Sequence, residues 1–213
     1  MEVIPVINCL DLECAVEKIR LAKEFLKDGD WLHLDIADGK FTFNKTWNDP
    51  AGWQNMAKGF NLEAHLMVEE PEKHTEEWLH AGAKRLIIHV ETINEKTLRQ
   101  ISALARKHGV ELMLSSNPET PVDKLKPYLD EFKEFQVLAV YPGPPAQKFL
   151  PIALYKIEFL RRSVPDAKIE VDGGIDFDTA KTVKNVGADK IVSGTYIFGN
   201  ADPKSAYEEL ISV

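Results

Sequence analysis

Short apolar segments recur along the chain at nearly regular intervals and alternate with segments of helical periodicity. The apolar segments are four to six residues long and rich in Val, Ile and Leu, as in strands buried on both faces of a parallel sheet. The segments between them carry apolar residues three and four positions apart, as in EKTLRQISALARKH. Eight strands are predicted in this way, over residues 3–7, 31–35, 62–67, 86–90, 110–115, 135–140, 168–172 and 190–193.

The order of these elements predicts a single (β/α)8 barrel over residues 1–213, with a helix between each pair of strands. The unit repeats about every 25 residues, and eight units match the minimum size of a closed barrel. Gly29, Gly82, Gly109 and Gly187 precede strands, and we interpret them as helix C-caps that need a left-handed backbone. An open doubly wound sheet is the alternative, but it usually has a glycine-rich fingerprint after its first strand, and VINCLDLE contains no glycine.

Composition and charge narrow the class of protein. Of 213 residues, 44% are hydrophobic and 28% are charged, which is enough for one sizeable core. A net charge of -8 argues against nucleic-acid binding, which needs clustered Lys and Arg. The sequence has no apolar run of membrane-spanning length and no signal-peptide pattern at its start, so we predict a cytoplasmic protein with no membrane partner. We expect Cys9 and Cys14, the only cysteines, to be reduced thiols.

Polar side chains stand at the ends of three predicted strands, where the active sites of barrels lie. His33 and Asp35 are two positions apart and therefore face the same way, while His65 and Asp172 end the third and seventh strands. Two imidazoles and two carboxylates suit Zn²⁺ best, and also Fe²⁺, Mn²⁺ or Co²⁺. A single such residue would more simply be an internal side chain with a hydrogen-bonded neighbour, but four at strand ends favour a metal site. Nothing pairs His89 with this set, so we interpret it as structural.

Five stretches resemble the ribulose-phosphate 3-epimerases in order and spacing, over nearly the whole chain. They are HLDIADGKFTFN, AHLMVEEPEKH, SSNPETPVDKLKPYL, YPGPPAQKF and IEVDGGIDFDTAKTVKNVGADKIVSGTYIFG. The resemblance implies a cytoplasmic homo-oligomer that converts D-ribulose 5-phosphate to D-xylulose 5-phosphate in the pentose phosphate pathway with the help of a metal ion. It implies metal ligands at His33, Asp35, His65 and Asp172, of which Asp35 and Asp172 are also the catalytic acid/base groups.

Elementary chemistry agrees with this assignment of two carboxylates. Inverting a carbon next to a ketone requires removal of its proton from one face and return of a proton to the other. The intermediate is an enediolate, whose negative charge a divalent cation can stabilise. Asp35 and Asp172 are therefore expected on opposite faces of the substrate.

The chain departs from the family pattern near the predicted substrate. Val6 stands where the family usually has a serine, and Asn8, one step nearer the rim, either contacts the substrate or caps the following helix. Met67 is retained among the methionines around the metal, but Ala37 and Leu138 replace two others. Because alanine is smaller than methionine, we expect a wider pocket.

The loop YPGPPAQKF raises a question about phosphate binding, because Pro144 and Pro145 have no N–H to donate. Other expected substrate contacts are retained, namely Gly143 in this loop, Gly173 and Gly174 after the seventh strand, and Gly194 and Thr195 after the eighth. We therefore predict a sugar-phosphate site with one rebuilt wall. Two alternatives stay open: an epimerase of another ketose phosphate, such as D-allulose 6-phosphate, and a barrel that binds a sugar phosphate without turnover.

Overall fold

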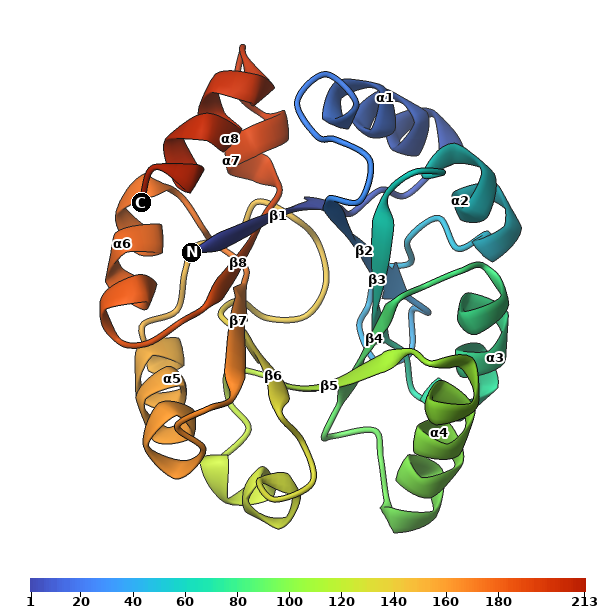
Figure 1. Cartoon of the computed structure of the whole chain (residues 1–213), viewed down its shortest axis with the longest axis vertical. Helices are drawn as coiled ribbons and strands as arrows, with labels where there is room; N and C mark the ends of the chain where they lie inside the picture. Colours follow the sequence, from blue (N-terminus) through green and yellow to red (C-terminus); the bar gives the residue numbers. More distant parts are fainter.

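The computed structural model describes residues 1–213 and contains a closed barrel of eight parallel strands, which confirms the predicted (β/α)8 fold (Figure 1). The strands follow one another around the barrel in chain order, and the eighth pairs with the first. Predicted and observed boundaries differ by at most two residues. The strands are β1 (Glu2–Ile7), β2 (Trp31–Ala37), β3 (Asn61–Met67), β4 (Arg85–His89), β5 (Glu111–Ser116), β6 (Glu134–Leu138), β7 (Lys168–Asp172) and β8 (Lys190–Ser193).

Helices form an outer ring around the barrel (Figure 1). The expected helix between every pair of strands is wrong in one place: β5 and β6 are joined by two short 3-10 segments, Val122–Lys124 and Lys126–Tyr128. Pro118, Pro121 and Pro127 explain this, because each lacks the N–H that an α-helix interior requires. The helices are α1 (Leu12–Ala22), α2 (Pro50–Met56), α3 (Pro71–His80), α4 (Glu95–His108), α5 (Ile152–Ser163), α6 (Phe177–Asn185), α7 (Thr195–Phe198) and α8 (Pro203–Ile211).

The glycines predicted as C-caps all have positive φ, but only Gly109 is itself a cap, at the end of α4 with φ 66°. Gly82 and Gly187 each lie one residue beyond the C-cap of their helix. Gly29 does not cap α1, which ends at Ala22, and lies instead in the turn before β2. The left-handed backbone is confirmed at all four glycines, whereas the prediction that a helix ends at Gly29 is wrong.

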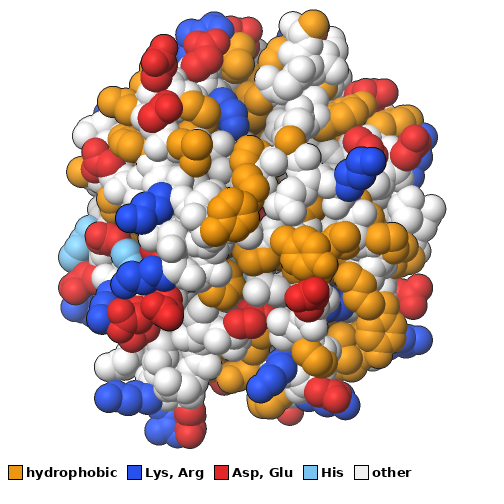
Figure 2. Space-filling model, turned by 180° about the vertical axis from the view of Figure 1, so that it is seen from behind, with side chains coloured by type: hydrophobic (Ala, Val, Ile, Leu, Met, Phe, Trp, Pro, Cys, Tyr) orange, Lys and Arg blue, Asp and Glu red, His pale blue; other side chains and the backbone are white.

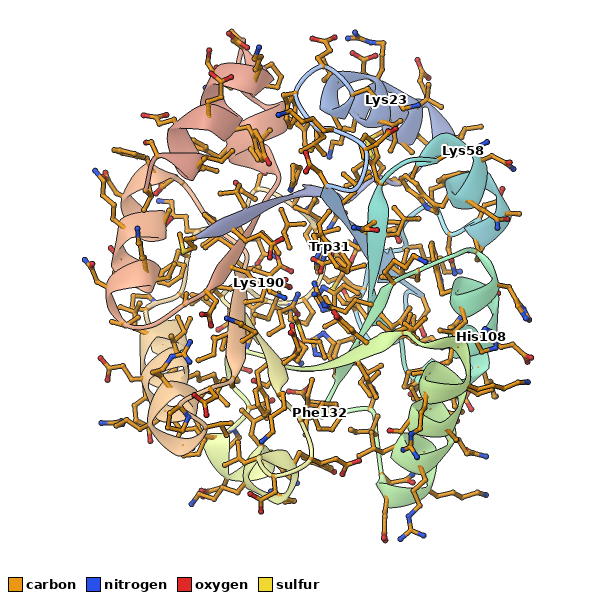
Figure 3. All side chains as sticks on the ribbon, in the orientation of Figure 1. Lys23, Trp31, Lys58, His108, Phe132 and Lys190 are labelled. Atoms are coloured by element: carbon orange, nitrogen blue, oxygen red, sulfur yellow. A yellow bond between two sulfur atoms is a disulfide. The ribbon has the colours of Figure 1, made fainter.

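The two faces of the sheet are covered differently. Outward side chains such as Leu34 and Ile169 join a core of 45 buried hydrophobic residues between the sheet and the helices. The inner face combines buried charged side chains with a small apolar cluster of Ile4, Val6 and Val192, against which Trp31 packs. Trp31 and Lys190 point into the barrel in Figure 3, whereas Lys23, Lys58 and His108 lie outside. The guanidinium of Arg85 lies 4.1 Å from the Trp31 ring centroid, and Lys190 donates to Glu134 at 2.8 Å.

Cys9 and Cys14 form a disulfide, so the prediction of reduced thiols is wrong. Asp11 caps α1, which therefore starts at Leu12 and places Cys14 in its first turn, facing back toward Cys9, two residues beyond the end of β1. The two Cα atoms lie 5.7 Å apart, within the range that a disulfide spans. A spacing of five residues does not reveal this, because the geometry depends on where the helix begins.

On the face seen in Figure 2, Lys and Arg side chains are interspersed with Asp and Glu and form no single basic patch, while hydrophobic side chains gather toward the middle. None of the helices has the length and apolar character needed to cross a membrane.

Candidate functional site

The structure brings His33, Asp35, His65 and Asp172 together at the C-terminal ends of β2, β3 and β7. Asp35 and His65 are partners in the β2–β3 register, and Oδ1 of Asp35 lies 3.1 Å from Nδ1 of His65 and 3.3 Å from Nε2 of His33. Asp172 completes the group from the other side of the barrel, with Oδ2 3.4 Å from Nδ1 of His65. One ligand atom from each residue lies within 4.8 Å of the others, so the predicted convergence is confirmed.

This group could hold a metal ion. It offers two imidazole nitrogens and two carboxylate oxygens, a donor set that suits Zn²⁺ and other first-row divalent ions. Burial would lower the pKa values of His33 and His65, but hydrogen bonds to the carboxylates outweigh burial and raise both. Burial would raise the pKa of Asp35, but hydrogen bonds from both histidines hold this pKa far below its ordinary value. Without a metal ion, the carboxylates therefore favour the protonated form of both imidazoles, and a divalent cation would displace those protons.

A buried carboxylate below the group orients His33. Nδ1 of His33 lies 2.7 Å from Oε1 of Glu63, so Nδ1–H donates to Glu63 and Nε2 faces Asp35. Glu63 is itself held by Arg85, whose Nη1 lies 2.5 Å from Oε2. Such hydrogen bonds to the far nitrogen of a histidine are typical around metal ligands.

His89 is a buried side chain outside the ligand group, in keeping with a structural role, but the premise that nothing pairs it with this set is wrong. Nε2 of His89 lies 2.7 Å from Nε2 of His65, and the two rings are stacked with centroids 5.0 Å apart. On its other side, Nδ1 of His89 lies 3.2 Å from Oε2 of Glu91. The signal in the sequence is that His89, like His65, lies near the C-terminal end of a strand, and that the two strands are neighbours.

A cavity of about 690 Å³ opens above the group. Asp35 and Asp172 line it, whereas His33 and His65 are fully buried and do not. Ala37 does not line it either, so its small side chain does not widen the cavity directly. The predicted substrate contacts all line it: Asn8, Met67, Gly143, Gly173, Gly174, Gly194 and Thr195.

Asn8 faces the cavity, so the alternative that it caps α1 is wrong; Asp11 does so. Nδ2 of Asn8 donates to Oδ2 of Asp35 at 2.8 Å and to the carbonyl oxygen of Gly143 at 3.1 Å. Asn8 therefore ties a carboxylate of the site to the loop after β6. Its Oδ1 is buried and has no partner in the protein, which leaves an acceptor for a hydroxyl group.

Three backbone N–H groups of the cavity wall, those of Gly173, Gly174 and Gly194, donate to no acceptor in the protein. Gly174 has φ 67°, and a Cβ there would lie 2.3 Å from the backbone N of Phe149, so only glycine fits. Pro144 and Pro145 line the cavity without donors.

Three comparisons place the chain among known proteins. The model of the ribulose-phosphate 3 epimerase family matches residues 3–198. A ribulose-phosphate 3-epimerase of Schizosaccharomyces pombe is 34% identical over 86% of this chain and 79% of its own, and the cytoplasmic isoform of Oryza sativa is 35% identical over 82% and 78%. A solved 3-hexulose-6-phosphate synthase from Salmonella typhimurium shares the fold, with a TM-score of 0.75 at 18% identity, covering 100% of this chain and 97% of that one.

Proposed function

The chain belongs to the ribulose-phosphate 3-epimerase family and is an epimerase, and we propose that it interconverts D-ribulose 5-phosphate and D-xylulose 5-phosphate by two-carboxylate acid/base catalysis. The observation that carries this proposal is the placement of Asp35 and Asp172. Both line one cavity, they come from β2 and β7, and two strands separate these in the barrel. A ketose between them would present opposite faces of C3 to the two carboxylates.

Asp35 suits the role of base because it stays deprotonated. Nδ2 of Asn8 donates to its Oδ2, and the hydrogen bonds of His33 and His65 to its Oδ1 hold its pKa far below the ordinary value against the effect of burial. Asp172, which lines the same cavity from β7, returns a proton to the other face of C3, and the two roles exchange in the reverse reaction.

His33, Asp35, His65 and Asp172 would hold the divalent ion, which the donor set fits. When bound, such an ion supplies positive charge that stabilises the enediolate oxygens. The protein itself orients the ligands: Glu63 fixes the ring of His33, and His89 contacts the far nitrogen of His65. We propose zinc, since two histidines and two carboxylates are among its common ligands.

The phosphate of the substrate would lie against the unpaired N–H groups of Gly173, Gly174 and Gly194, with Thr195 beside them. Asn8 then faces the sugar through its unpartnered Oδ1, and Met67 lines the wall next to the metal ligands. An epimerase for another ketose phosphate, D-allulose 6-phosphate, is the second candidate, because Asn8 and Val6 both line the cavity where the family usually has a serine at position 6.

Proton exchange at C3 tests both candidates. Wild-type protein in D₂O is incubated with ribulose 5-phosphate or with allulose 6-phosphate, and NMR follows deuterium entry and epimer formation. We expect fast exchange with the pentulose phosphate, while Asp172→Asn abolishes epimer formation and keeps some exchange, because one base suffices to remove a proton. A faster reaction with allulose 6-phosphate would select the second candidate, and no exchange with either would indicate a binding protein.

A further inference from the structure

Lys18 lines the cavity, and nothing in the fold requires a cation there. It projects from α1 into the cavity wall, which in this region also includes Gly199 and Asn200 from the segment after β8. Its side chain is partly buried, whereas Lys148, the other lysine of the wall, is exposed. Lys18 is therefore the one partly buried ammonium group that faces the cavity.

The ammonium group is placed between the end of β1 and α7. Its only hydrogen bond runs from Nζ to the carbonyl oxygen of Asn8 at 3.2 Å, and Nζ lies 5.7 Å from the ring centroid of Phe198, the last residue of α7. Gly194, which precedes α7, packs against the same strand, since a Cβ there would lie 2.8 Å from Cγ1 of Val6. Two of the three N–H donors of Lys18 stay unused beside the loop that carries Gly194.

This position is costly without a partner. Burial lowers the pKa of Lys18, and the negative charge of Asp35 offsets only part of that effect. No carboxylate pairs with the ammonium group, and an unpaired charge away from water is unfavourable. An anion bound in the cavity would supply the missing counter-charge.

The charge balance of the cavity indicates which anion this is. Asp35, Asp172 and Asp176 line the wall, and a divalent ion would offset two of these charges. A phosphate group adds almost two more negative charges at neutral pH. In the loop after β6, Pro144 lacks an N–H, and the side-chain amide of Gln147 already donates to the carbonyl oxygens of Tyr141 and Pro144. The one cation of this loop, Lys148, is exposed and therefore more strongly screened by water than Lys18.

We propose that Lys18 binds the phosphate group of the substrate and thereby selects phosphorylated ketoses. Its four-carbon side chain can turn the ammonium from the Asn8 carbonyl toward a phosphate held by the N–H groups of Gly173 and Gly194. The inference rests on the proposed function, because it takes the ligand to be a ketose phosphate.

Lys18→Gln tests the assignment, because glutamine can keep the hydrogen bond to Asn8 but carries no charge. We expect the inhibition constant of inorganic phosphate and the KM for the ketose phosphate each to rise about tenfold, as for loss of one charge-assisted hydrogen bond, with kcat nearly unchanged. Lys18→Arg should recover most of the affinity. The matched control is Lys23→Gln, an exposed lysine just beyond the end of α1, which should behave as wild type.

Activity on the unphosphorylated ketose distinguishes failure of the Lys18 assignment from failure of the proposed function. The kcat/KM for this ketose should be equal in wild type and Lys18→Gln, because it has no phosphate to lose. If wild type prefers the phosphorylated ketose and Lys18→Gln keeps that full preference, the assignment of Lys18 is overturned while the proposed function stands. If wild type shows no preference for the phosphorylated ketose, both are overturned. An equal loss on both substrates would show that Lys18 acts on the fold or the sugar, and would also overturn the assignment.

Discussion

Nε2 of His65 lies 2.7 Å from Nε2 of His89, so one of these nitrogens carries the proton and the other accepts it. Burial lowers the pKa of His89, which is therefore neutral, and its Nδ1 lies 3.2 Å from Oε2 of Glu91, a carboxylate that can only accept. His89 then donates through Nδ1 and accepts through Nε2, and His65 donates from its Nε2. This leaves Nδ1 of His65 facing Asp35 and Asp172 as a ligand atom.

Removing His89 should therefore weaken metal binding without removing a ligand. We expect His89→Phe to lower the affinity for Zn²⁺ by about 10–100-fold, the usual effect of losing a partner behind a metal ligand. Glu91→Gln should act in the same direction and more weakly, since glutamine can still accept from Nδ1. Competition with a chromogenic chelator measures the affinity.

His108→Phe is the matched control, because His108 is exposed on the last turn of α4. An affinity for Zn²⁺ in His89→Phe equal to that of the control would show that His89 only fills space. If circular dichroism shows that His89→Phe does not fold, the zinc affinity of Glu91→Gln decides the question instead.

Metal binding should release protons and weaken as the pH falls. The carboxylates raise the pKa values of His33 and His65 above 6.5 in the metal-free protein, although burial opposes this shift. Protons and the metal ion therefore compete for the same nitrogens. The affinity is expected to fall as the pH drops through these raised values. Calorimetric titration at pH 7 in two buffers of different ionisation enthalpy should give different heats, and identical heats would contradict the prediction.

The strand-end residues could be predicted because alternation along a strand fixes which side chains share a face. That rule and the location of active sites in barrels are enough to predict the group of His33, Asp35, His65 and Asp172. The fold followed from the repeat of apolar segments and helices. The exception, the β5–β6 connection, has prolines that break helical periodicity, and these were visible in the sequence.

Contacts between elements could not be predicted in the same way. The stacking of His89 on His65 depends on the β3–β4 register, in which His65 is paired with Ile87, two residues before His89. The ion pair of Glu63 and Arg85 inside the barrel depends on that same register. Charged residues within apolar strands, as in LEAHL and KIEVD, were the available signal for a polar interior.

Restoring a donor to the loop after β6 should tighten substrate binding. Pro145→Gly returns one N–H at the cavity wall, and a hydrogen bond to a charged group contributes about 1.5–3 kcal/mol, part of which the added loop flexibility offsets. We expect a KM for the ketose phosphate several-fold lower, with little change in kcat. The KM for the unphosphorylated ketose is the control, and an equal decrease there would mean that the change only opens the cavity.

The disulfide should stabilise the start of α1 and the position of Asn8. Cys9 directly follows Asn8, and the bond closes a loop of a few residues, for which the loss of chain entropy in the unfolded state predicts about 2 kcal/mol. Reduction of wild type by dithiothreitol should lower the unfolding free energy by that amount and raise the KM. The double variant Cys9→Ser, Cys14→Ser should resemble the reduced protein and not respond to dithiothreitol, and a response would mean that the reagent acts elsewhere, for instance on the metal.

Glu170 makes the folded protein less stable as the pH rises from about 4.5 to 8. It is fully buried, its Oε2 has no hydrogen-bond partner, and burial together with the negative charge of Glu63 raises its pKa to about 8. Between the ordinary value of 4.5 and about 8 the unfolded chain releases this proton while the folded protein keeps it. The folded state binds more protons in this range, so its stability falls as the pH rises, by up to about 1.4 kcal/mol per pH unit.

Glu170→Gln removes this dependence, because glutamine is neutral at every pH and keeps an oxygen that can accept from Nε2 of Gln136. We expect the two metal-free proteins to be nearly equally stable at pH 4.5 and the variant to be more stable by roughly 1–3 kcal/mol near pH 8. Urea unfolding across this range measures the difference, with Glu158→Gln on the exposed face of α5 as control. If the stability of wild type and Glu170→Gln changes in parallel from pH 4.5 to 8, Glu170 is already ionised in the folded protein, and the ammonium of Lys190 and the guanidinium of Arg85 must then balance both Glu63 and Glu170.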